Sequence, residues 1–288
     1  MNIWMYVIRE MEDALDDCKE GCDFETNCND DPVHAWDEAV AFYTGTLEGK
    51  DGSGDGKLLH ALADKRCSNF KTCGDLANAE TGTSHVNLEI FREFSIGLNK
   101  IVQGECASAR AQKERIEQLM AIPLIQGSLR YAYITNFDAD AGEKAEAEGA
   151  VFAASVLPLV HACNADAAAT VYNNLKVGQR NSANFQQVRE AFESVYECMG
   201  IRSEYIGGLW DSSTKQYMKG AAPAGVSSGS SDPNIGLIVG LSVGGAVVLI
   251  LAFFLSRKRG QKKAVEKQLS VSNASQEQPV DQEDSEVM

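Results

Sequence analysis

Apolar residues recur at helical spacing along most of the chain. Strong helix formers fill residues 143–155, and acidic residues stand near the start of that segment. Alternating β-branched runs are absent, and the chain has only six prolines. Two apolar faces at helical spacing are formed by Leu88, Phe91, Leu98, Ile101 and Val102, and by Phe185, Val188, Phe192, Val195 and Met199. The pattern predicts an all-α fold.

One apolar run is long enough to form a membrane-spanning helix outside the globular part. Residues 235–255 carry no charge over 21 positions, which as a helix crosses the roughly 30 Å hydrocarbon layer. Basic residues follow this run directly, and such residues stay on the cytoplasmic side. We expect a type I single-pass protein of the plasma membrane with a helical ectodomain at 1–219, a Gly/Ser/Pro stalk at 220–234, a transmembrane helix at 235–255 and a cytoplasmic tail at 256–288.

Both ends of this arrangement carry further signals. Gly236, Gly240 and Gly244 form a ridge of small residues in the expected span, which allows close contact between two such helices in a homodimer. Residues 1–10 have neither the basic region nor the apolar core of a signal peptide. We therefore expect the chain to be an N-terminally incomplete copy of a longer protein.

Charge is distributed unevenly between the two sides of the expected membrane span. The chain has 41 acidic and 26 basic residues, for a net charge of −15. The expected tail holds equal numbers of both, so the negative charge belongs to the ectodomain, where it can concentrate cations. Such acidity disfavours nucleic acid as a partner, because its backbone is also negative.

All the cysteines precede the expected span. An even number on one side of a membrane favours up to four disulfides in an oxidising compartment, and the sequence leaves their pairing open. Thiolate zinc sites are the alternative, although the spacings lack the CxxC knuckle. The expected disulfide cysteines are Cys18, Cys22, Cys28, Cys67, Cys73, Cys106, Cys163 and Cys198.

Short blocks of sequence recur in the same order in the two halves of the ectodomain. They suggest two related helical repeats, at about 30–110 and 140–215, with a cleft between them where a ligand could bind. The matched blocks are 38–42 with 148–152, 58–61 with 159–162, and 87–93 with 184–190.

Candidate metal ligands gather on the first of these blocks. Asp31 and Pro32 can begin a helix, on which His34, Asp37 and Glu38 share one face. Iron(III) prefers carboxylate and phenolate oxygens and tolerates imidazole, and further candidate ligands are Tyr43, Glu148 and His161. The alternative is an ordinary solvated helix face.

A second cluster contains an arginine between apolar residues and tyrosines. Tyr131 and Tyr133 are candidate phenolate ligands, and Arg130 could hold a small planar anion such as carbonate. The alternative is amphipathic packing. The sequence contains no P-loop or HExxH motif, so we do not expect an enzyme.

Four segments together resemble the algal Fea-type iron-assimilation family. These are DPVHAWDEAVAFYTGTLEG (31–49), LADKRCSNFKTC (62–73), PLIQGSLRYAY (123–133) and EAEGAVFAASVLPLVHAC (146–163). The C-terminal anchor is similar to that of the membrane-bound members, the phytotransferrins, which are made under iron starvation. The resemblance covers about residues 5–220.

The resemblance implies a function but supplies no ligand set. It implies binding of iron(III) with carbonate at the cell surface and uptake by endocytosis, without catalysis. An acidic adhesion or interaction protein that binds no metal is the competing hypothesis. An imelysin-like metallopeptidase is a third, but His34-x-x-Asp37 departs from the H-x-x-E motif of those proteins.

Overall fold

The computed structural model describes residues 2–22, 28, 31–45, 58–179 and 182–225. This part of the chain is mostly helical, as predicted. Its elements are α1 (Asn2–Glu20), α2 (Pro32–Thr44), α3 (Leu59–Phe70), α4 (His85–Val102), α5 (Cys106–Phe137), α6 (Glu143–Cys163), α7 (Ala165–Leu175), α8 (Phe185–Glu193), α9 (Ser203–Ile206), β1 (Trp210–Asp211) and β2 (Gln216–Tyr217).

The two strands are the departure from an all-α fold. They pair antiparallel, with Trp210 opposite Tyr217 and their rings 4.9 Å apart. Asp211 caps the turn by accepting hydrogen bonds from the backbone and hydroxyl of Ser213 and from Thr214. These hydrogen bonds lower the pKa of Asp211 to about 2. The periodicity missed the hairpin because each strand has only two residues.

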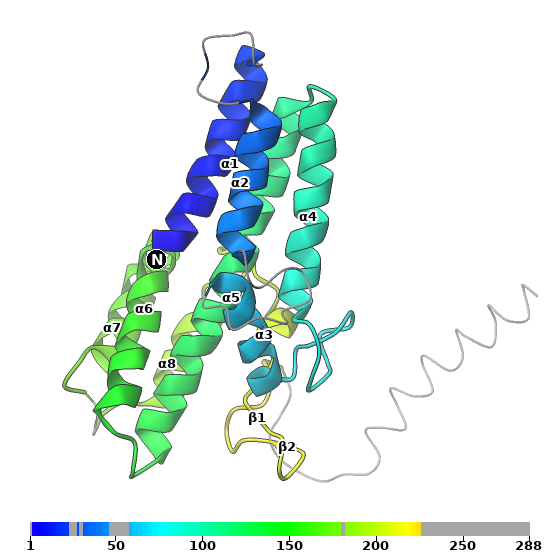
Figure 1. The fold of residues 1–288 in the computed structure, drawn as a ribbon. Coiled ribbons are helices and arrows are strands. Elements are labelled where there is room, and N and C mark those ends of the chain that lie inside the picture. The colour runs from blue at the N-terminus through cyan, green and yellow to red at the C-terminus, as the bar shows by residue number, and fades with distance from the viewer. Residues whose placement is uncertain (1, 23–27, 29–30, 46–57, 180–181, 226–288) are drawn as a thin grey trace, which may run out of the picture. The chain divides into compact units, whose positions relative to one another are not determined.

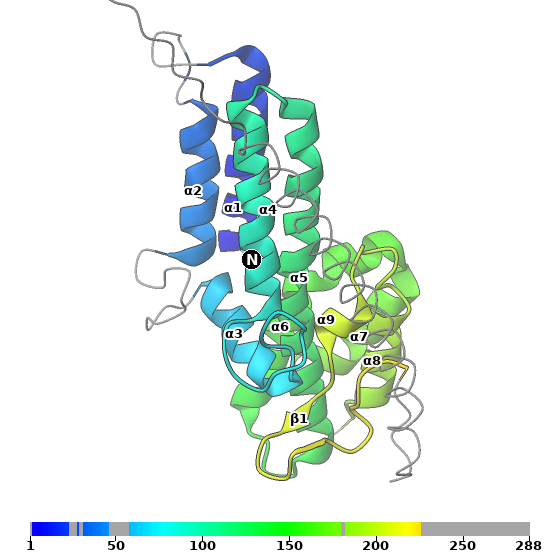
Figure 2. The same cartoon turned by 90° about the vertical axis from the view of Figure 1, so that its right-hand side faces the viewer.

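Helix α5 is shared by two helical bundles within the described domain (Figures 1 and 2). It has 32 residues and is therefore about 48 Å long. Its first part packs with α1 and α4, both of which also contact α2, and its second part packs with α6, α7 and α8. Helix α3 contacts α2, α4 and α5. The middle of the domain is thus the region where both bundles and α3 meet.

The sequence blocks proposed as repeats are distributed over several helices of these bundles. Block 38–42 lies in α2 and block 148–152 in α6. Block 58–61 leads into α3, whereas its counterpart 159–162 lies in the last turns of α6. Two matched blocks thus share one helix in the second half and occupy two helices in the first.

Local sequence signals set several helix boundaries and faces. Helix α2 begins at Pro32, and the Asp31 carboxylate accepts hydrogen bonds from the backbone of Val33 and His34, as the Asp–Pro pair indicated. The predicted apolar face is confirmed on α8, where Phe185, Val188 and Phe192 are buried. Its last two members, Val195 and Met199, are also buried but lie in the segment after the helix.

The predicted face of α4 is rotated about the helix axis relative to the observed one. Ile101 is buried as predicted, but Val102 is 67% exposed, and the other buried positions include Val86, Ile90, Phe94 and Gly97. The reason is Trp36 of α2, because a Cβ added at Gly97 would lie only 2.2 Å from the Trp36 ring. Trp36 also donates to the carbonyl of Phe94 at 3.0 Å. Space for the indole therefore decides the orientation of α4.

All eight cysteines form disulfides, as predicted, so no thiolate is left for the zinc alternative. Two bridges join distant elements, the end of α1 to the start of α5 and the end of α6 to the segment after α8. The pairs are Cys18–Cys106, Cys22–Cys28, Cys67–Cys73 and Cys163–Cys198. Four disulfides indicate an extracellular or secreted domain.

The predicted transmembrane helix and cytoplasmic tail lie outside the described residues. Within the described ranges, no helix combines the length and the apolar character needed to cross a membrane. The packed domain extends past the predicted boundary at residue 219, because Ala221 and Ala222 are 2% and 6% exposed. The Ala221 carbonyl also accepts a hydrogen bond from the backbone of Leu209 at 2.9 Å.

Candidate anion and metal groove

Two glycines bring α5 and α6 unusually close together. A Cβ at Gly127 would lie 2.5 Å from the Phe152 ring, and one at Gly149 would lie 3.1 Å from the Cβ of Tyr131. The rings of Tyr131 and Phe152 stack, with centroids 5.7 Å apart and planes 13° from parallel. This close packing places Tyr131 of α5 beside Glu148, one position before Gly149 on α6.

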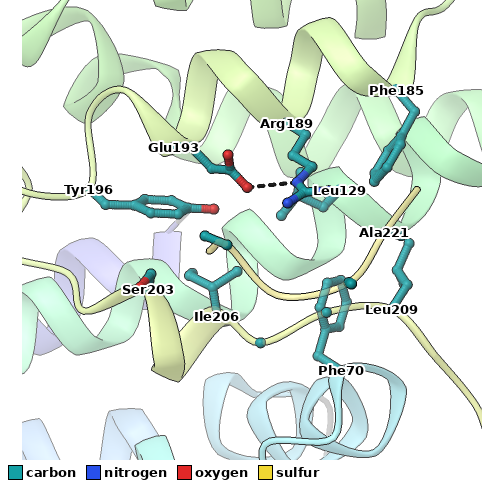
Figure 3. Close-up of a pocket in the computed structure, with 14 residues that line it drawn as sticks. Phe70, Leu129, Phe185, Arg189, Glu193, Tyr196, Ser203, Ile206, Leu209 and Ala221 are labelled. Atoms are coloured by element: carbon teal, nitrogen blue, oxygen red, sulfur yellow. Dashed lines mark hydrogen bonds and ion pairs between the residues drawn. The ribbon is translucent and has the colours of Figure 1, made fainter. Parts of the chain in front are cut away.

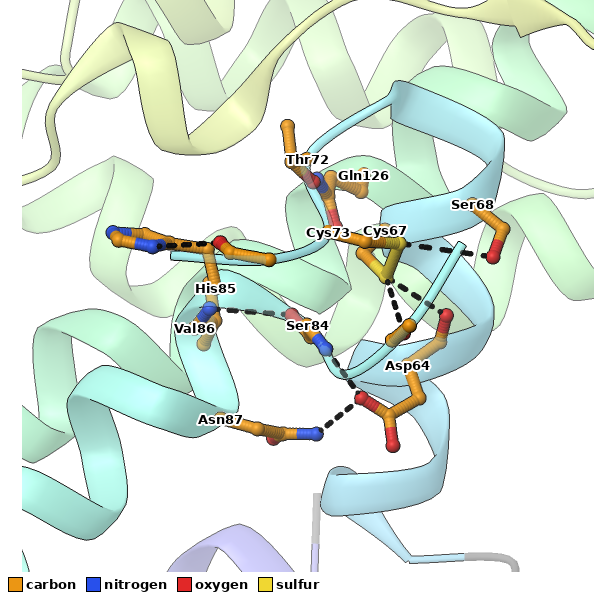
Figure 4. Close-up of a disulfide and its surroundings, with 12 residues drawn as sticks. Asp64, Cys67, Ser68, Thr72, Cys73, Ser84, His85, Val86, Asn87 and Gln126 are labelled. Atoms are coloured by element: carbon orange, nitrogen blue, oxygen red, sulfur yellow. Dashed lines mark hydrogen bonds between the residues drawn. A yellow bond between two sulfur atoms is a disulfide. The ribbon is translucent and has the colours of Figure 1, made fainter. Parts of the chain in front are cut away.

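The close contact between α5 and α6 forms a seam. Helix α3 is held next to this α5–α6 seam by the segment that follows it (Figure 4). The Cys67–Cys73 disulfide closes the end of α3, and Gln126 of α5 donates to Thr72 at 3.2 Å and to the Ile206 carbonyl at 2.9 Å. Arg66, the residue before this disulfide, is 2% exposed. Its guanidinium is thereby held against α5 and α6.

A groove of about 400 Å³ lies between α3 and the α5–α6 seam. One part of its wall is apolar and the other carries charged and phenolic groups. Its lining residues are Leu62, Lys65, Arg66, Tyr131, Lys144, Ala147, Glu148, Val151 and Phe152. Arg130 adjoins the groove, with its guanidinium carbon 5.7 Å from the centre of the Tyr131 ring.

Several arginine nitrogens at this groove lack protein acceptors, although Arg66 also has a hydrogen bond with the side chain of Tyr131. Among the described residues, Nε and Nη1 of Arg66 and Nε of Arg130 are buried and have no hydrogen-bond partner. Burial, and then repulsion by Arg130, lower the pKa of Arg66, but an arginine stays charged at any ordinary pH. Buried polar atoms are nearly always paired in folded proteins, so unpaired guanidinium groups point to an anion from outside.

Tyr131 and Glu148 supply oxygen atoms in the same groove. Burial and hydrogen bonding to the Glu148 carboxylate raise the pKa of Tyr131, so the phenol keeps its proton in the metal-free chain. Lys144 lies 3.9 Å from Glu148 and is 88% exposed. The groove thus combines two potential oxygen ligands with an excess of positive charge.

Three of the residues selected from the sequence therefore meet, namely Arg130, Tyr131 and Glu148. Arg66 was not selected, although a signal for it exists. The buried positions Leu59, Ala63, Arg66 and Phe70 follow helical spacing, so the arginine occupies the apolar side of α3. A charged residue at such a position is rare and marks a site of interest.

The predicted ligands of α2 do not meet in one site. His34, Asp37 and Glu38 lie on the solvent-exposed side, and the His34 imidazole contacts the Asp31 carboxylate. Tyr43 is fully buried on the opposite side of the helix, where its hydroxyl donates to the Asn87 side chain. The phenol is therefore separated from the carboxylates with which it was grouped.

Two other candidates lie away from the groove. Tyr133 packs against Phe137 and Phe185, with ring centroids 4.7 and 5.1 Å apart, and burial raises the pKa of its phenol. His161 is exposed on α6, thirteen residues after Glu148 and hence about 20 Å further along the helix. Neither side chain shares a site with Tyr131.

A second, enclosed cavity lies between α8, α9 and the end of the domain (Figure 3). Its volume is about 20 Å³, which is room for one water molecule. Its charged residues already have partners, since Arg189 bonds to Glu193 at 2.6 Å and to the Gly220 carbonyl at 2.8 Å. This cavity is too small and too well satisfied to receive a ligand.

Known proteins offer no guide to this site. No family model, no characterised protein and no solved structure matches the chain. The groove between α3, α5 and α6 is the candidate site on the strength of its own geometry.

Proposed function

We propose that this chain is a cell-surface protein that binds iron(III) together with carbonate and mediates iron uptake by endocytosis. The observation that carries the proposal is the meeting of Tyr131 and Glu148 with Arg66 and Arg130 in one groove. Phenolate and carboxylate oxygens are preferred ligands of hard cations such as iron(III). Guanidinium groups bind planar oxyanions through pairs of parallel hydrogen bonds.

Each group has a distinct part in the proposed binding. The nitrogens of Arg66 and Arg130 that lack protein acceptors hold carbonate, whose charge offsets theirs. Tyr131 gives up its proton to solvent when iron(III) binds, and Glu148 contributes a second oxygen. The net charge of −15 concentrates cations near the domain. The protein itself catalyses no reaction in this proposal.

The remaining architecture belongs to the same proposal. It comprises two related helical repeats, an anchor at 235–255, a cytoplasmic tail at 256–288 and a homodimer formed through Gly236, Gly240 and Gly244. Support comes from the two bundles that share α5, from the disulfides and from the basic residues after the apolar run.

An iron(III) titration of the purified full chain, with its disulfides intact and with or without bicarbonate, tests the proposal. We expect a saturable visible charge-transfer band that requires bicarbonate. Tyr131→Phe should abolish this band, whereas Tyr172→Phe should retain it, because Tyr172 is 52% exposed on α7 and lies outside the groove.

Two outcomes would count against the proposal in different ways. A band that survives in Tyr131→Phe would show that the phenolate ligand lies elsewhere. If the chain shows no saturable iron(III) binding, the metal-free adhesion or interaction function becomes the better explanation of the acidic domain.

A further inference from the structure

The groove is much larger than carbonate. Its volume of about 400 Å³ lies within the range of about 300–1,000 Å³ that small-molecule sites occupy. Since a water molecule in the liquid takes about 30 Å³, the groove holds roughly a dozen waters. An anion of four heavy atoms bound at the arginines would leave most of this space filled with solvent.

Positive charge is spread along the groove rather than concentrated at one point. Lys65 and Arg66 reach it from α3, Lys144 reaches it from α6, and Arg130 adjoins it from α5. Among the described residues that line it, Glu148 is the only one with a carboxylate. Four cationic groups on three helices suit an anion that carries several separated negative charges.

The apolar part of the wall distinguishes an organic anion from an inorganic one. Leu62, Val151 and Phe152 line the groove beside the charged groups, and Val151 is 66% exposed. Inorganic phosphate offers only oxygen atoms to this wall. A short aliphatic backbone that carries carboxylates would cover it and remove apolar surface from water.

We propose that the groove binds a small organic polycarboxylate of the citrate class, with its carboxylates on the arginines and its methylene groups on the apolar wall. The same ligand takes the place of carbonate on the arginines and brings iron(III) to Tyr131 and Glu148 as a polycarboxylate complex, and this second part rests on the proposed function. Anion binding to the metal-free chain is independent of it.

Calorimetric titration of the metal-free full chain with citrate tests the inference, with inorganic phosphate, bicarbonate and acetate as comparison anions. Citrate should bind saturably and at least tenfold more tightly than any of the three. Arg66→Met should weaken citrate binding at least tenfold. Arg92→Met should leave it unchanged, because the Arg92 side chain is 69% exposed on α4 and lies outside the groove.

A second variant protects the test against misfolding of Arg66→Met. Val151→Asp places a negative charge on the exposed wall of the groove and should also weaken citrate binding at least tenfold. Phosphate binding as tight as citrate binding would overturn the inference in favour of an inorganic oxyanion site. Unchanged citrate affinity in both variants would overturn it by placing the anion elsewhere.

Iron binding separates this inference from the proposed function. Iron(III) binding that needs bicarbonate, without any citrate binding, would refute the polycarboxylate and leave the proposed function intact. Citrate binding by a chain that binds no iron(III) would support the anion site and refute the proposed function.

Discussion

Two buried cations on neighbouring parts of the fold have very different surroundings. Lys113, in the first part of α5, is 8% exposed, and its amino group lies 2.5 Å from Glu12 and 2.7 Å from Glu117. Arg110 adds two hydrogen bonds to Glu12, at 3.1 and 3.2 Å. Arg66 is buried still more deeply, but two of its guanidinium nitrogens have no hydrogen-bond partner among the described residues, and its hydrogen bond is with the Tyr131 phenol rather than with a carboxylate.

The difference separates a structural charge from one to which we assign an anion in the proposed function. A buried charge costs free energy unless it is paired and hydrogen-bonded. Lys113 has both kinds of partner and fastens α1 to α5. Arg66 lacks a carboxylate partner of its own beside a solvent-filled groove, so the fold bears a cost that a bound anion would offset.

The largest expected effect is the loss of the paired cation. Lys113→Met leaves the Glu12 and Glu117 carboxylates facing each other without the amino group between them. We expect the free energy of unfolding to fall by about 3 kcal/mol, measured by denaturant titration. Lys19→Met, in an exposed pair with Asp16, should change it by less than about 1 kcal/mol. Equal stability of the two variants would refute a structural role for Lys113.

A smaller effect is expected where the groove is shaped by close packing. Gly127→Ala should lower the free energy of unfolding by about 2 kcal/mol, because the added methyl group would lie 2.5 Å from Phe152. It should also weaken anion binding by displacing the Tyr131–Phe152 stack. Gly142→Ala, where a Cβ meets nothing within 4 Å, is the control. A Gly127→Ala protein as stable as this control would show that the seam can relax.

The functional cation should respond with the opposite sign. Arg66→Met replaces a buried charge that has two unpaired nitrogens by an apolar side chain of similar length, and we expect the free energy of unfolding to rise by about 1 kcal/mol in the ligand-free chain, because the loss of the hydrogen bond with Tyr131 is smaller than the relieved cost of burial. Thermal unfolding without added anions measures this change. If the variant is instead destabilised as much as Lys113→Met, Arg66 belongs to the structural framework.

The smallest expected effect is the contribution of Glu12 to the pH dependence of stability. Hydrogen bonding to Lys113 lowers the pKa of Glu12 despite the opposing effect of burial. A carboxyl whose pKa is lowered on folding stabilises the fold above its unfolded-state pKa, and this contribution is lost as the pH falls through the folded-state value. Glu12→Gln should therefore cost at most about 1 kcal/mol at pH 7 and nothing at low pH.

Urea titrations at pH 7 and below pH 4 measure the difference between Glu12→Gln and the unmodified chain. The exposed Glu114, substituted by Gln, provides the comparison. A difference that persists unchanged in acid would show that the Glu12 charge does not act through Lys113.

Much of the local structure followed from the sequence. The helix start at Asp31–Pro32, the apolar face of α8 and the disulfide state of all cysteines were predicted from spacing and residue type. These features depend on residues a few positions apart in the sequence or on the number of cysteines. The orientation of α4 did not follow, because it depends on the indole of Trp36 from another helix.

The candidate site was predictable only in part. Arg130 and Tyr131 stood out as neighbouring guanidinium and phenol groups after an apolar segment, and Glu148 stood out because it matches Glu38 in the proposed repeat. Their grouping with His34, Glu38 and His161 does not match the structure, where these residues lie on exposed helix surfaces. Helical spacing shows which residues share a face, but not which faces meet.

By itself, the sequence determined a helical, disulfide-bonded and acidic domain, since periodicity, cysteine number and charge need no knowledge of distant contacts. Only the tertiary structure decided which cysteines pair and that Arg66 lies beside Tyr131 and Glu148. The physical reason is close packing. Gly127 and Gly149 let α5 and α6 approach closely, and this approach leaves a groove rather than a filled interface beside α3.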